Sequence, residues 1–105
     1  MEIILHAHNA DIPDSLREQA EAAIRRIAIR LHRVANAIIR FIGDGPTRRV
    51  EIVLQSTRTG SLFAMADARD FAPALATAVQ RLESQVARAR TQRTRRNTRP
   101  GDRIG

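Results

Sequence analysis

The sequence predicts an α+β fold of two layers, in which two helices cover one face of a four-stranded sheet. Short segments alternate apolar and polar side chains with a period of two, which indicates strands. Two longer segments repeat apolar residues in steps of three and four, which indicates helices. Their order is strand, helix, three strands, helix, and a chain of 105 residues suits one such domain with a modest core.

The strands are bounded by turn sequences. In the first, Ile3, Leu5 and Ala7 share one face. The sequences "GDGP" and "TRTGS" separate the last three strands by short links that contain glycine, so these three are expected to form an antiparallel meander. The predicted strands are residues 2–8, 35–42, 48–56 and 62–67.

The first helix is expected to open near Pro13, which suits a first helical turn, or at Ser15, which has capping-box spacing with Glu18. Ile29 lies off its apolar stripe. This stripe is predicted to comprise Leu16, Ala20, Ala23, Ile24, Ile27, Leu31 and Val34.

The second helix is expected to begin near Asp70, a good N-cap residue, with Pro73 tolerated in the first turn. The stripe fades near Arg90, so residues 1–90 are predicted to be the folded domain. Residues 91–105 have nothing to bury and are predicted to be an arginine-rich tail that is disordered or frayed. The stripe is predicted to comprise Phe71, Leu75, Ala78, Val79, Leu82 and Val86.

Positive charge is concentrated at the C-terminal end. All 18 basic residues are arginine, against 11 acidic residues, for a net charge of +7. Residues 88–105 hold seven of these arginines and Asp102, which leaves residues 1–87 almost neutral at +1. A basic tail favours polyanions such as RNA, DNA or an anionic membrane face, and the guanidinium fork suits phosphate. A compositional bias that replaces lysine throughout is the alternative explanation for the missing lysine.

The composition gives little support for catalysis or for metal binding. The absence of cysteine excludes disulfides and thiolate zinc sites. His6 and His8 lie two residues apart on one strand face and could both point toward one metal ion. A zinc site needs three or four ligands, and the third histidine, His32, is expected on a helix. No nucleophile motif or phosphate-binding glycine loop occurs. We therefore expect no enzyme activity, cofactor, metal or small-molecule substrate.

No apolar segment approaches the roughly 20 residues that span a bilayer, and the first residues do not form a secretory signal. We therefore expect a cytoplasmic protein with no membrane partner.

Arginines follow one flank of each predicted helix. Arg26, Arg30 and Arg33 share a flank of the first helix, and Arg81 and Arg88 lie seven residues apart on the second. Such rows can bind phosphates, and the alternative is a solvated face paired with nearby carboxylates. Three phenylalanines without tryptophan or tyrosine leave little for base stacking, which favours contacts to the RNA backbone and to its shape.

The segment "DFAPALATAVQRLESQVARAR" resembles the second helix of the ribosome hibernation promoting factors, also called ribosome-associated inhibitor or sigma-factor modulation proteins. The first helix, "DSLREQAEAAIRRIAIRL", and Asn9 after the first strand also fit, and the likeness covers residues 1 to about 92. The residues that match the second helix are Asp70, Phe71, Ala74, Leu75, Arg81, Leu82, Glu83, Gln85, Val86, Arg88 and Arg90.

The resemblance implies a β-α-β-β-β-α fold, similar to a double-stranded-RNA-binding domain with an added N-terminal strand. It also implies a protein, expected to be monomeric off the ribosome, that binds the small ribosomal subunit between head and body. Such proteins contact rRNA through basic residues on the helices and occupy the space of mRNA and tRNA, so translation in idle ribosomes stops without catalysis. The expected rRNA-binding residues are Arg26, Arg30, Arg33, Arg81, Arg88 and Arg90, with Arg93, Arg95, Arg96 and Arg99 of the tail for longer reach.

The sequence departs from the family pattern at three positions. Ala23 replaces a lysine, His8 replaces an arginine and Arg30 replaces an aromatic residue. The chain also lacks the C-terminal dimerisation domain of the family's long form, so either ribosome pairing or silencing of single ribosomes remains open. A general RNA- or DNA-binding module, or a regulator of transcription that binds protein through its solvent-facing sheet, remains an alternative.

Overall fold

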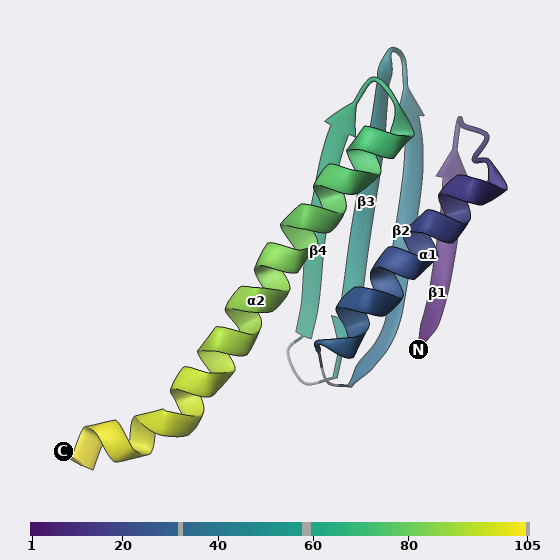
Figure 1. Cartoon of the computed structure of the whole chain (residues 1–105). Helices are drawn as coiled ribbons and strands as arrows, with labels where there is room; N and C mark the ends of the chain where they lie inside the picture. Colours follow the sequence, from purple (N-terminus) through teal and green to yellow (C-terminus); the bar gives the residue numbers. More distant parts are fainter. Residues whose placement is uncertain (32, 58–59, 105) are drawn as a thin grey trace.

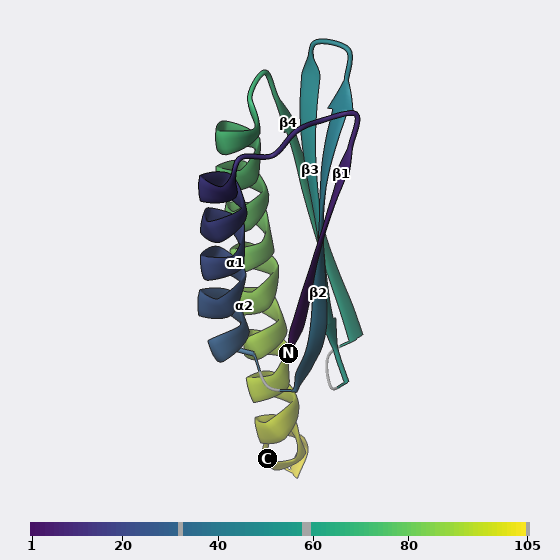
Figure 2. The ribbon, with the colours of Figure 1, turned by 90° about the vertical axis from the view of Figure 1, so that its right-hand side faces the viewer.

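The computed structural model describes the backbone of residues 1–31, 33–57 and 60–104, and the side chains of these residues as far as Ala89. Both helices lie on one face of the sheet, as Figures 1 and 2 show, which confirms the predicted order and the two layers. The elements are β1 (Glu2–His8), α1 (Asp14–Ile29), β2 (Val34–Asp44), β3 (Thr47–Ser56), β4 (Gly60–Ala68) and α2 (Phe71–Ile104).

The four strands follow one another across the sheet in chain order. β1 pairs with β2 in parallel, whereas β2 with β3 and β3 with β4 are antiparallel, so the predicted meander is confirmed. Two parallel neighbours need a crossover connection, and α1 provides it by returning over the face of the sheet. α2 then packs on β3 and β4 beside α1 (Figure 1).

The core lies between the helices and one face of the sheet. Strand alternation sends Ala37, Ile39 and Phe41 of β2 into it, all of them fully buried. The ring of Phe71, at the start of α2, packs edge-on against Phe41 with 5.6 Å between ring centroids. Every residue of the two predicted helical stripes packs in this core or directly against it, including Val34, which belongs to β2.

The start of α1 near Pro13 confirms one of the two predicted openings, whereas its capping and its end differ from the prediction. The helix begins at Asp14 after Pro13, with no side-chain cap hydrogen bond, so the predicted capping box of Ser15 and Glu18 does not form. Ser15 lies inside the first turn, where it cannot cap the helix; instead the Pro13 carbonyl accepts the first N–H bonds. At the other end the helix stops at Ile29, and Val34, predicted on the helical stripe, is the first residue of β2.

The ends of α2 were predicted with mixed success. The Asp70 carbonyl accepts the N–H of Ala74 at 3.3 Å, which confirms the helix start. The backbone continues as one helix to Ile104, past the boundary predicted near Arg90. Loss of the apolar stripe does not by itself end a helix. Arginine, which supplies five of residues 91–104, has good helix propensity, whereas the threonines, Pro100 and Gly101 in the same segment do not. The side chains of 90–105 lie outside the described residues, so a separate disordered tail at 91–105 stays a prediction.

Gly43 allows β2 to approach the end of β1. A Cβ at this position would clash with the carbonyl oxygen of Asn9, which has a left-handed φ of 53°. We expect Gly43→Ala to lower the free energy of unfolding by about 2–3 kcal/mol, because backbone must move to relieve the clash. Thermal or urea denaturation measures this effect.

Gly45→Ala is the matched control for Gly43→Ala. Gly45 has a φ of 59° but no atom near its missing Cβ, so alanine there meets only backbone strain. That strain should cost about 1 kcal/mol. An equal or larger loss at Gly45 would show that the close approach of Asn9 is not what requires glycine at position 43.

Candidate nucleic-acid interface

Arg26 and Arg30 lie on the flank of α1 that faces α2. The guanidinium Nη1 of Arg30 donates to Oε2 of Glu83 on α2 at 3.3 Å, and both side chains are 43% exposed. An exposed pair of this kind contributes at most about 1 kcal/mol, so a phosphate can displace Glu83 at small cost. Arg26, one turn earlier, is exposed and has no ion pair among the described residues.

Arg33 does not belong to the row predicted on α1. It follows the end of the helix, with a left-handed φ of 60°, and its carbonyl accepts the N–H of Thr57 at 3.0 Å. The hydroxyl of Thr57 also donates to this carbonyl at 3.4 Å. The backbone of Arg33 therefore joins the α1–β2 connection to the end of β3, and its exposed side chain departs from there.

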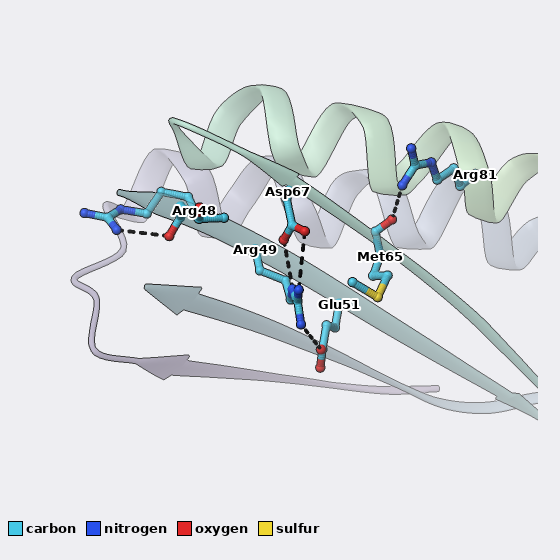
Figure 3. A network of polar contacts seen from close by, with 7 residues as sticks. Arg48, Arg49, Glu51, Met65, Asp67 and Arg81 are labelled. Carbon is cyan, nitrogen blue, oxygen red and sulfur yellow. Dashed lines mark hydrogen bonds and ion pairs between the residues drawn. The ribbon is translucent and has the colours of Figure 1, made fainter. Parts of the chain in front are cut away.

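The opposite flank of α2 lies along the edge of β4. Arg81 donates from Nη1 to the carbonyl oxygen of Met65 at 2.6 Å (Figure 3). Gln85 accepts the N–H of Phe63 at 3.2 Å, and its amide donates to the Phe63 carbonyl. These side chains satisfy outward-facing backbone groups of an edge strand, which would otherwise be free to pair with another chain.

This arrangement fixes Arg81 without neutralising it. Its acceptor is an uncharged carbonyl, so the full guanidinium charge remains while one N–H holds the side chain in place. Arg88 lies seven residues farther along the same flank, exposed and without an ion pair among the described residues. The two residues form a row of positive charge on this flank of α2, in which Arg81 is held by the edge of β4.

The two arginine rows lie on opposite flanks of α2. Arg30 of α1 contacts α2 through Glu83, on the flank of α2 that faces α1. Arg81 is part of α2 and lies on its other flank, which faces β4. Both rows belong to the helix layer, and they lie on the two sides of α2. A nucleic acid that uses both rows must therefore cross α2, which suits a folded RNA with phosphates on two sides better than a single extended strand.

The remaining predicted residues are in the C-terminal half of α2. The side chains of Arg90, Arg93, Arg95, Arg96 and Arg99 lie outside the described residues, although the helical backbone runs through them. Their role in RNA binding stays a prediction.

Two arginines that the sequence did not single out are held within the sheet layer. Arg49 donates from Nε to Asp67 at 2.8 Å and from Nη2 at 3.3 Å, and Glu51 lies 4.0 Å away (Figure 3). The hydrogen bond from Arg49 lowers the pKa of Asp67.

Arg48 donates to the carbonyls of Gly45 and Thr47 and lies over the ring of Phe71. Arg48 therefore stabilises a strand end, and Arg49 stabilises a cross-strand pair. Their partners depend on the strand register, which cannot be read from the sequence.

One hollow of the described residues lies beside the helix layer. A hollow of about 350 Å³ lies between the first turns of the two helices, lined by Pro13, Ser15, Leu16, Gln19, Phe71 and Ala72, none of which titrates near neutral pH. Within the same part of the chain, no group of three His, Cys, Asp or Glu side chains could hold a metal ion. Among the described helices, none has the length and apolar character to cross a membrane.

Comparison with known proteins identifies a family and similar folds. Residues 3–94 match the family described as Sigma 54 modulation protein / S30EA ribosomal protein. A ribosomal subunit interface protein from Coxiella burnetii has a similar structure, with a TM-score of 0.78 and 22% identity over 87% of this chain and 99% of that one. The N-terminal domain of Protein Y from Thermus thermophilus is also similar, with a TM-score of 0.73 and 27% identity over 84% of this chain and 98% of that one. A search of curated proteins found no match.

Proposed function

Because the chain belongs to the Sigma 54 modulation protein / S30EA ribosomal protein family, we propose that it binds the small ribosomal subunit through rRNA and blocks the mRNA and tRNA sites of idle ribosomes. The family match over residues 3–94 carries this proposal. The structure also resembles a ribosomal subunit interface protein, and a chain with the same fold can present the same kind of surface. In this proposal the protein acts in the cytoplasm, where ribosomes are.

The helix layer supplies the contacts in this proposal. Arg26, Arg81 and Arg88 are exposed and form no ion pair with a described carboxylate, and the core beneath the helices keeps the spacing of their backbone positions fixed. Guanidinium groups bind phosphate oxygens in a bidentate manner, which positions the domain without reading bases. Arg30 joins them when a phosphate replaces Glu83.

Inhibition by this route needs no catalysis. A domain that occupies the path of mRNA and tRNA excludes them by volume, and the block lasts as long as the domain is bound. The strength of the block therefore follows from affinity and concentration alone. Release needs only weaker phosphate contacts, so binding should decrease as salt increases.

Sedimentation with purified ribosomal subunits tests the proposal. We expect the protein to pellet with small subunits, and to stay with them when excess duplex RNA is added, because a fixed spacing of arginines matches one folded rRNA surface. Loss of the protein to the duplex competitor would instead indicate a general RNA-binding module. A second run uses a cell lysate treated with nuclease. If the protein still sediments there as part of a large complex, the complex is held by protein contacts, which would indicate a regulator that binds protein.

A further inference from the structure

The face of the sheet opposite the helices carries an apolar row across all four strands. The strand register places Ile4 beside Ile38, Ile38 beside Val53, and Val53 beside Phe63. Phe63 is 45% exposed, and no helix covers this side of the sheet (Figure 2). Ile4, Ile38 and Val53 are partly buried. A partly exposed apolar row between polar residues is typical of a surface that binds protein.

Polar rows flank this apolar row on both sides. Asn36 and Gln55 are neighbours on one side of it, and Arg40 and Glu51 are neighbours on the other. Arg40 has no ion pair among the described residues, and the described ion pair of Glu51 is the long one to Arg49, at 4.0 Å. The central strands therefore present an amide pair, an apolar pair and a pair of opposite charges, in that order.

We propose that this open face binds the same face of a second copy of the chain, in a symmetric sheet-on-sheet dimer. A two-fold axis that runs parallel to the strands, between β2 and β3, places β2 of one copy on β3 of the other. Each residue of β2 then faces the residue of the second copy that corresponds to its own cross-strand neighbour. Ile38 meets Val53, Arg40 meets Glu51, and Asn36 meets Gln55 of the second copy.

Complementarity at each of these positions selects a second copy as the occupant. At these three pairs apolar groups meet apolar groups, amides meet amides, and opposite charges meet. The next pair places Ile42 opposite Arg49, whose charge is paired with Asp67 of its own chain. A two-fold axis perpendicular to the strands would instead oppose the charged row to the amide row. Sheets that pack face to face cross at about 30°, which preserves alignment best near the axis, where these central pairs lie.

The assembly should be weak. Strand spacing and rise give four strands of seven residues a face of roughly 450 Å². A standard interface buries about 800 Å² per partner, so the dimer should form only at high protein concentration. At low concentration the chain is then monomeric, as the sequence suggested. Both helix layers point outward in this dimer, so Arg26, Arg81 and Arg88 stay accessible and the inference does not depend on the proposed function.

Charge exchange between the two central strands tests the dimer. Analytical ultracentrifugation of the full chain, without RNA, should show a sedimentation coefficient that increases between about 10 and 500 µM. Arg40→Glu and Glu51→Arg should each weaken association at least tenfold, because like charges then meet twice across the axis. An equal mixture of the two variants should recover association, since every introduced charge then faces its opposite in the other chain.

Two controls separate this interface from general effects. Arg25→Glu makes the same charge change on the outer side of α1 and should leave association unchanged. The double variant Arg40→Glu/Glu51→Arg restores the cross-strand pair within each chain and should associate like the original. A chain that stays monomeric at 500 µM, a mixture that fails to recover, or an equal effect of Arg25→Glu would each overturn the proposal.

Discussion

Exchanging Arg26 and Arg88 for glutamate should weaken binding to the small ribosomal subunit at least 100-fold. A hydrogen bond to a charged group contributes about 1.5–3 kcal/mol, and each substitution also adds repulsion from a phosphate. Because every 1.4 kcal/mol is about tenfold in affinity, two lost contacts reach this value without any change of fold. A titration of labelled protein with small subunits measures the effect.

The fold should not change, because neither side chain belongs to the core. Both are exposed and unpaired among the described residues, so the free energy of unfolding should move by no more than about 0.5 kcal/mol. Arg17→Glu/Arg25→Glu is the matched control, with the same charge change on the exposed surface of α1 away from α2. If this control weakens binding as strongly, the attraction depends on net charge and the two arginine rows do not place the domain.

Much of the fold could be predicted from the sequence because each period has one simple cause. Alternation over 35–42 and 48–56 identified β2 and β3, which the structure extends by one or two residues at the ends. Val34 was wrongly assigned to the helical stripe. The chain turns at Arg33, which adopts a left-handed φ, and a sequence pattern does not predict this conformation for a residue other than glycine.

The site was harder to predict, because periodicity places a side chain on a flank without saying what lies beside that flank. Arg30 and Arg81 were both expected to face RNA, yet one pairs with Glu83 and the other donates to the edge of β4. Gln85 contacts the same edge, although in the sequence it stood out only as a match to the second helix of the family. Its partner is a backbone group 22 residues away, and only the packing of α2 on β4 brings the two together.

Replacing Arg93, Arg95, Arg96 and Arg99 with glutamine in the full chain should flatten the salt dependence of ribosome binding. Each phosphate contact contributes roughly 0.9 to the slope of log affinity against log salt, so four lost contacts should reduce the slope by about three to four. At about 150 mM salt this corresponds to a loss of affinity on the order of 100- to 1,000-fold. Titrations at a series of salt concentrations measure both quantities.

Glutamine is the informative substitution because it has good helix propensity and removes only charge, so the helical backbone through residues 91–104 can persist. The core packs around residues up to Val86, so stability should not change. If the arginine rows on the helix layer place the domain and the C-terminal arginines add attraction, the preference for small subunits over duplex RNA should survive while the slope decreases. If the preference disappears together with the slope, the C-terminal arginines themselves recognise the subunit, and the two rows beside α2 only add affinity.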